Sequence, residues 1–138
     1  MRPMDLTLHV IGHVRSPLTS REGAPRQGDE GAPEADLDLL DEVAPALGGI
    51  TVGDDLLVLT WLHQGDRSTL TTRPRNDPAR PETGVFATRS PDRPNPIGLH
   101  RVTVLAVDGT RLHVSGLEAI DRTPVVDLKP VLGGVDER

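Results

Sequence analysis

The sequence predicts a mainly β fold, with the residue pattern of a small antiparallel or mixed barrel or sandwich. Strand-length apolar runs separated by polar turns dominate the chain, without the alternation of strands and helices typical of parallel sheets. No glycine-rich loop of the GxGxxG kind follows a strand, which argues against the doubly wound nucleotide-binding fold. The 138 residues suffice for one hydrophobic core, so we expect a single domain over residues 1–138.

The first third of the chain is expected to contain a strand, a loop and a short helix. Alternating apolar residues at the start of residues 6–14 predict a half-buried strand. Residues 21–34 are rich in Gly, Pro and charge and predict a loop. Apolar residues within 37–47 have rough helical spacing, and Pro45 with the following glycine pair limits this helix to two or three turns.

The remaining elements are all expected to be strands. The continuous apolar run at residues 56–62 predicts a buried strand, and residues 69–72 are a possible short one. Two alternating runs within residues 102–117 predict a hairpin, with Asp108–Gly109 as a type I′ turn. Residues 125–128 predict a last short strand.

A proline-rich segment, GVFATRSPDRPNPIG at residues 84–98, is the most informative part of the chain. Its three prolines fix φ, remove backbone donors and push the preceding residues toward extended conformations, so neither a helix nor a central strand can run through it. A stiff loop that carries Arg89 and Arg93 can hold two guanidinium groups in place at little entropic cost on binding. The alternative is an ordinary proline-rich surface turn.

This segment resembles the signature of the TrmO/TsaA-like family, S-adenosylmethionine-dependent methyltransferases built on a small β-barrel. The best-known members methylate the N6 nitrogen of threonylcarbamoyladenosine beside the tRNA anticodon. Four other stretches resemble further family motifs in the same order, IGHVRSPL at 11–18, APRQG at 24–28, WLHQ at 61–64 and LEAIDRTPVVDLKP at 117–130. The resemblance implies a β-barrel methyltransferase that uses S-adenosylmethionine and forms a homodimer with the cofactor near the subunit interface.

The resemblance also implies which residues contact the cofactor. An arginine can fork onto its carboxylate, and an acidic residue can accept hydrogen bonds from ribose hydroxyls or the ammonium group. No metal is required. The matching positions are Pro25, Arg26, Gln27, His63, Gln64, Arg89, Leu99, Leu117, Glu118, Ala119 and Ile120.

Two residues are candidates for the base that assists methyl transfer. His63 is the first candidate and Asp121 the second, because the acceptor nitrogen is a poor nucleophile until its proton leaves. The alternatives are a strand-end histidine that satisfies backbone groups, and an aspartate that caps local amides beside an Asp127–Lys129 pair. Arg122 stands where the family's motif more often has glycine, which changes backbone freedom at that turn. The other four histidines have no spacing that suggests metal ligation.

Composition and charge leave the methyl acceptor open. The chain has no cysteine, and nothing in it resembles a signal peptide or a membrane span, so we expect a cytoplasmic protein. The leading hypothesis is tRNA, but the net charge of −6 is unusual for a tRNA enzyme, and the longer bacterial enzymes continue into a C-terminal domain beyond the point where this chain stops. The alternatives are N-methylation of a small amine or amide metabolite, and a non-catalytic cofactor- or RNA-binding module.

Overall fold

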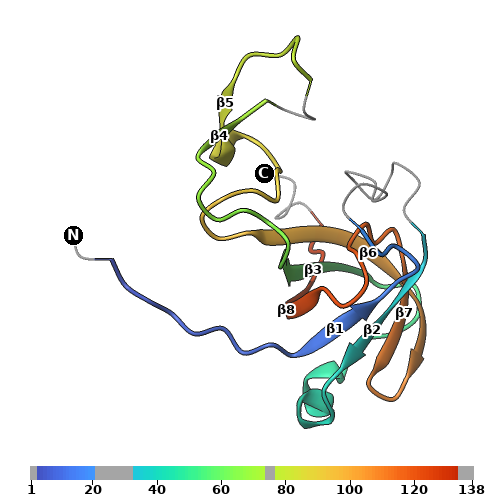
Figure 1. The fold of residues 1–138 in the computed structure, drawn as a ribbon. Helices are drawn as coiled ribbons and strands as arrows, with labels where there is room; N and C mark the ends of the chain where they lie inside the picture. Colours follow the sequence, from blue (N-terminus) through green and yellow to red (C-terminus); the bar gives the residue numbers. More distant parts are fainter. Residues whose placement is uncertain (1–2, 21–32, 74–76, 134–138) are drawn as a thin grey trace.

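Six strands close into a barrel in the order β1-β2-β7-β6-β3-β8, and every neighbouring pair is antiparallel (Figure 1). This computed structural model describes residues 3–20, 33–73 and 77–133. The barrel strands are β1 Gly12–Arg15, β2 Ala35–Leu39, β3 Asp55–Trp61, β6 Ile97–Asp108, β7 Arg111–Ser115 and β8 Pro124–Pro130. The mainly β, barrel-like fold class expected from the sequence is therefore confirmed.

Outside the barrel, strands β4 Thr71–Thr72 and β5 Thr83–Gly84 pair with each other. This two-stranded sheet stands beyond one end of the barrel in Figure 1. Two short 3₁₀ helices complete the fold, η3 Asp41–Leu47 below the barrel and η5 Val85–Ala87 directly after β5. The short strand expected at residues 69–72 is thus present over its second half.

The core lies inside the barrel and is built from inward-facing alternate residues. In β3 the side chains of Leu56, Val58 and Thr60 are buried while the intervening ones are partly exposed. The continuous apolar run at residues 56–62 is therefore buried on only one face of the sheet, because the outward side chains of β3 are partly exposed to solvent. The buried cluster consists of Val14, Ala35, Leu37, Leu39, Leu56, Val58, Val102, Val104, Leu112, Val114, Leu117, Ala119 and Val125. Branched aliphatic side chains fill a small barrel well, so it needs no aromatic core.

The helix expected within residues 37–47 is wrong over its first part. Ala35–Leu39 form strand β2, in which the buried Ala35, Leu37 and Leu39 alternate with two aspartates. Only Asp41–Leu47 are helical, as a 3₁₀ helix that contains Pro45. The helical spacing was misleading because it combined the inward-facing residues of a strand with apolar residues of the helix that follows. Within Ala35–Leu39 the apolar residues repeat every second position, as in a strand.

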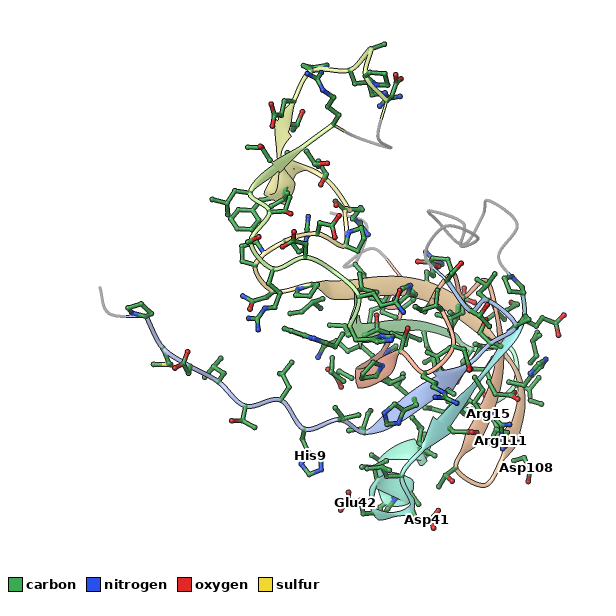
Figure 2. All side chains as sticks on the ribbon, in the orientation of Figure 1. His9, Arg15, Asp41, Glu42, Asp108 and Arg111 are labelled. Carbon is green, nitrogen blue, oxygen red and sulfur yellow. The ribbon has the colours of Figure 1, made fainter. Side chains whose placement is uncertain are left out.

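The half-buried strand expected at residues 6–14 is also only partly correct. Strand β1 begins at Gly12, while residues 3–10 are extended but unpaired, with Leu6 and Leu8 exposed. In Figure 2 this segment leads away from the barrel, and the labelled His9 lies on it. His9 Nε2 is 3.6 Å from Glu42 Oε1 of η3.

The predicted hairpin is present as β6 and β7, but its turn is shifted by one residue. Asp108 pairs with Arg111, so the two central residues are Gly109 and Thr110. Gly109 has a φ of 59°, and no positive φ occurs at Asp108 or Thr110. A positive φ at the first central residue alone is the pattern of a type II′ turn rather than type I′.

Candidate functional site

One end of the barrel gathers the three connections that carry the sequence-predicted site residues. Strands β1, β3 and β7 finish at this end and β2, β6 and β8 begin there, as the pairs Arg15 with Asp36, Trp61 with Ile97 and Thr60 with Val125 show. The connections are residues 16–34, 62–96 and 116–123. His63, Gln64 and Arg89 lie on the second, Leu117 to Asp121 on the third, and Leu99 just inside β6. Pro25, Arg26 and Gln27 lie outside the described residues.

The turn that carries His63 and Gln64 packs against the proline-rich loop. The Leu62 backbone N–H donates to the Pro96 carbonyl oxygen at 2.7 Å, and the Arg67 Nε–H donates to the Pro94 carbonyl oxygen at 2.7 Å. Arg67 also lies over the Trp61 ring, with its guanidinium carbon 5.1 Å from the ring centroid. His63 and Gln64 are exposed beyond these contacts. The structure therefore brings the His-Gln pair and the signature loop together.

The two arginines of the signature loop have different environments. Arg93 is half-buried, and its Nη2 donates to the backbone carbonyl oxygens of Val85 and Thr88, the second at 2.6 Å. Arg89 is exposed and makes no hydrogen bond or ion pair with any of the described residues. Arg93 therefore shapes the loop, whereas the Arg89 guanidinium has no partner among the described residues.

Asp121 connects two of the three loops. Its Oδ1 accepts a 3.0 Å hydrogen bond from the Ser16 backbone N–H, and its own N–H donates to the Leu18 carbonyl oxygen at 2.6 Å. The next residue, Arg122, has a φ of 69° and donates its N–H to the Val14 carbonyl oxygen at 2.7 Å. This geometry supports the amide-capping interpretation of Asp121. The left-handed backbone at Arg122 also explains why glycine suits that position.

Within residues 117–120 only Glu118 presents a side chain toward other polar groups. Leu117, Ala119 and Ile120 are buried, so they can offer a ligand mainly their backbone. The Oε1 atom of Glu118 is 2.5 Å from Nδ1 of His100, whose Nε2 is 2.7 Å from Oγ1 of Thr60. The sequence analysis did not predict this network of hydrogen bonds, although Gly98, His100 and Val102 alternate on the inward face of β6.

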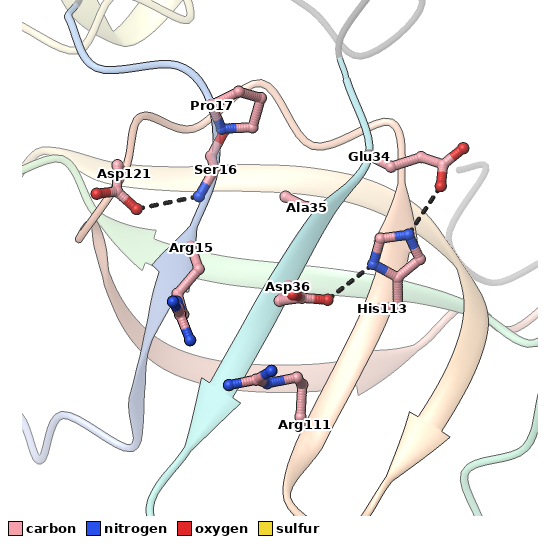
Figure 3. A pocket seen from close by; sticks show the side chains of 9 residues that line it. All are labelled: Arg15, Ser16, Pro17, Glu34, Ala35, Asp36, Arg111, His113 and Asp121. Carbon is pink, nitrogen blue, oxygen red and sulfur yellow. Dashed lines mark hydrogen bonds and ion pairs between the residues drawn. The ribbon is translucent and has the colours of Figure 1, made fainter.

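A polar hollow of about 470 Å³ lies over the outward faces of β1, β2 and β7 (Figure 3). There the His113 ring bridges two carboxylates, with Nδ1 2.7 Å from Asp36 and Nε2 2.7 Å from Glu34. Hydrogen bonding to Asp36 first, and to Glu34 second, raises the pKa of His113. Among the predicted site residues that the structure describes, this hollow includes only Asp121.

Neither a metal site nor a membrane-spanning helix is found within the described ranges 3–20, 33–73 and 77–133. No cluster of three or more His, Asp or Glu side chains there has the arrangement of metal ligands. No helix within these ranges is long and apolar enough to cross a membrane.

Comparisons with known proteins show the family of this chain. A family model described as the tRNA-methyltransferase O N-terminal domain matches residues 13–137. A probable S-adenosyl-L-methionine-binding protein of Methanothermobacter thermautotrophicus is 39% identical over 136 residues, which cover 99% of this chain and 97% of that protein. An S-adenosyl-L-methionine-binding protein of Archaeoglobus fulgidus is 39% identical over 131 residues, covering 95% of this chain and 93% of that protein.

Solved structures share the fold. A crystal structure of TrmO from Pseudomonas aeruginosa superposes with a TM-score of 0.74 at 31% identity, covering 98% of this chain and 60% of that one. A second TrmO crystal structure gives a TM-score of 0.77 at 34% identity, with coverage of 98% and 61%. The chain therefore spans about three fifths of the length of these solved relatives.

Proposed function

The chain belongs to the family of tRNA-methyltransferase O N-terminal domains, S-adenosylmethionine-dependent methyltransferases, and on that premise we propose that it methylates the N6 nitrogen of threonylcarbamoyladenosine in tRNA. The observation that carries the proposal is that two loops leave the barrel at the same end, residues 62–96 with His63 and Arg89 and residues 116–123 with Glu118.

The side chains at this end suit S-adenosylmethionine chemically. The Arg89 guanidinium, without a partner among the described residues, can bind the α-carboxylate as a charged, two-pronged donor. The Glu118 carboxylate can accept hydrogen bonds from ribose hydroxyls or the α-ammonium group, and Leu99, 44% exposed, offers apolar contact. The sulfonium supplies an activated methyl group, so the protein has to bind, orient and desolvate rather than provide an electrophile.

The chain must also take a proton from the acceptor nitrogen. His63 is exposed in the turn that follows β3 and has no hydrogen-bond partner in the part of the chain that the structure describes, so its imidazole is available to accept that proton. Asp121 is less suited, because its Oδ1 already accepts the Ser16 amide. We therefore assign proton transfer to His63.

A second candidate acceptor is a small amine or amide metabolite. The net charge of −6 favours it, because binding to a tRNA phosphate backbone ordinarily depends on an excess of Lys and Arg. A third candidate, a cofactor- or RNA-binding module without turnover, would keep the Arg89 and Glu118 contacts but need no base at position 63.

One set of measurements separates these candidates. Transfer of labelled methyl from S-adenosylmethionine to bulk tRNA, combined with mass spectrometry of nucleosides from a strain that lacks the gene, should show N6-methylated threonylcarbamoyladenosine that depends on the protein. Label that enters a metabolite extract instead of tRNA would identify the second candidate. Binding of S-adenosylhomocysteine without transfer to either pool would identify the third.

The homodimer is part of the same proposal. Phe86, near the start of the signature segment, is 83% exposed, and Ile97 and Leu99, at its end and just after it, are both 44% exposed on neighbouring outward positions of β6. Exposed apolar side chains gathered near a binding loop suit burial against a second copy of the chain. Light scattering at micromolar concentration should give twice the monomer mass. Phe86→Ser should lower that mass, while Val52→Ser, exposed at the other end of the barrel, should not.

A further inference from the structure

A network of three hydrogen-bonded polar side chains, Thr60, His100 and Glu118, extends from the barrel interior to the loop at residues 116–123. Thr60 is fully buried and His100 is 4% exposed, both on inward positions of their strands, whereas the Glu118 side chain is 14% exposed. The separations are 2.7 Å from Thr60 Oγ1 to His100 Nε2 and 2.5 Å from His100 Nδ1 to Glu118 Oε1. Each link is short enough for a direct hydrogen bond.

The backbone of β6 makes room for this network at Gly98. Gly98 pairs directly with Thr60 across β3 and β6. A Cβ atom at position 98 would overlap both Thr60 Oγ1 and His100 Nε2. The absence of a side chain is therefore what lets the hydroxyl and the imidazole meet inside an otherwise aliphatic barrel.

The chemistry of the three groups sets the direction of the hydrogen bonds. An ionised carboxylate only accepts, so His100 must carry a proton on Nδ1 and donate it to Glu118. In the neutral ring Nε2 is then an acceptor, and the Thr60 hydroxyl donates to it. A ring fixed at both nitrogens in a packed interior has one orientation, and it holds one oxygen of Glu118 in one place.

We infer that His100 is a positioning residue, which holds the Glu118 carboxylate ready for hydrogen-bond donors of the bound cofactor. This inference rests on the proposed function and adds to it a residue that touches no ligand itself. The effect comes from preorganisation, because a carboxylate already fixed on one oxygen loses less freedom when its ligand binds. Glu118 without His100 would keep its charge but lose its fixed position.

A matched pair of substitutions tests this. The amide of His100→Asn can replace the Nδ1 donor and keep the bond to Glu118, whereas the amide of His100→Gln reaches the Nε2 position and keeps the bond to Thr60. Both place a smaller polar group in the same cavity, so their losses of stability should be similar. Calorimetry with S-adenosylhomocysteine should show affinity about 10-fold weaker for His100→Gln and within about threefold of wild type for His100→Asn.

A second measurement reports the tautomer of the His100 ring directly, and it requires neither enzymatic activity nor ligand binding. Nitrogen-15 spectra of the His100 ring in the ligand-free protein should show the Nδ1–H tautomer, and Glu118→Ala should abolish that preference.

Binding of 5′-methylthioadenosine, which lacks the amino-acid end of the cofactor, identifies the group that donates to Glu118. His100→Gln should weaken this binding as well if Glu118 binds the ribose hydroxyls. It should leave the binding unchanged if Glu118 binds the ammonium group. Either result supports a role for the carboxylate.

The contrary results are distinct. Wild-type affinity in His100→Gln, equal weakening in both variants, or an Nε2–H tautomer in the wild-type protein would overturn the inference alone. Failure of the wild-type chain itself to bind S-adenosylhomocysteine would overturn the proposed function and this inference with it.

Discussion

The guanidinium of Arg93 donates a 2.6 Å hydrogen bond to the backbone carbonyl oxygen of Thr88, five residues earlier in the chain. The same nitrogen also donates to the Val85 carbonyl oxygen. These bonds close the proline-rich loop on itself, and they separate Arg93 from Arg89, which faces solvent one residue beyond Thr88. We therefore expect Arg93 to affect the stability of the protein and Arg89, four positions earlier, to affect ligand binding.

Arg93→Ala should destabilise the protein without directly removing a ligand contact. It deletes charge-assisted hydrogen bonds to two backbone carbonyls, each worth about 1.5–3 kcal/mol, and part of that loss is recovered by water at the loop surface. We expect a decrease of about 1–3 kcal/mol in the free energy of unfolding, measured by urea denaturation. Arg93→Lys, which keeps one charged donor nitrogen, should lose less, and equal stability of all three proteins would contradict this role.

Arg89→Ala should have the reverse effect. Because Arg89 has no partner among the described residues, its removal should leave the urea midpoint unchanged. Loss of a charged hydrogen bond to the cofactor should weaken S-adenosylhomocysteine binding about 10- to 100-fold by calorimetry. Unchanged affinity would show that Arg89 is only solvated.

Arg122→Gly should stabilise the fold. Arg122 has a φ of 69° and its side chain is almost fully exposed, so glycine relieves backbone strain and removes no buried contact. The expected gain is about 0.5–1 kcal/mol after the extra freedom of glycine in the unfolded chain is subtracted. Arg122→Ala keeps a Cβ atom and serves as the control, which should be no more stable than wild type in thermal denaturation.

Stability should depend on the titration of His113. Only the imidazolium can donate from both ring nitrogens to Asp36 and Glu34, so the folded state raises its pKa above 6.5. The stabilisation is complete below the unfolded pKa of about 6.5 and is lost as the pH rises through the higher folded pKa. With the side chain 38% exposed, solvent limits it to less than about 1 kcal/mol.

The measurement for His113 compares two proteins at two pH values. Urea unfolding of the wild-type chain at pH 6 and pH 9 should show lower stability at pH 9, and His113→Gln should show a smaller difference between the two. A wild-type difference that His113→Gln retains in full would assign the pH dependence to other groups.

Sequence reasoning predicted the barrel and most of its strands, because period-two alternation is clear in the first part of β6 and in β7. It failed at Ala35–Leu39, where aspartates on the outward face lowered the apparent β propensity and Leu40 extended a false helical spacing. It also expected the wrong pair of turn residues at Gly109. A shift of one residue in a hairpin register is decided by strand pairing, which a local pattern does not contain.

For the candidate site, the sequence indicated segments but no contacts between side chains. The family resemblance indicated His63, Arg89 and Glu118, whereas the residue pattern alone does not distinguish Arg89 from Arg93. That difference arises from which carbonyl oxygens the folded loop turns toward each guanidinium. The Glu118–His100 bond joins residues on a loop and a strand, and such pairings become visible only when the barrel closes.

The small sheet of β4 and β5 is structurally separate from the barrel wall. Its two strands pair only with each other within the described residues, so substitutions in Thr71–Thr72 and Thr83–Gly84 break no hydrogen bond of the barrel wall. Both its ends return to the same rim, beside the exposed His63 turn and the Arg89 loop. Under the proposed function, substitutions in this sheet can change the surface through which the methyl acceptor approaches, at little cost to the stability of the barrel.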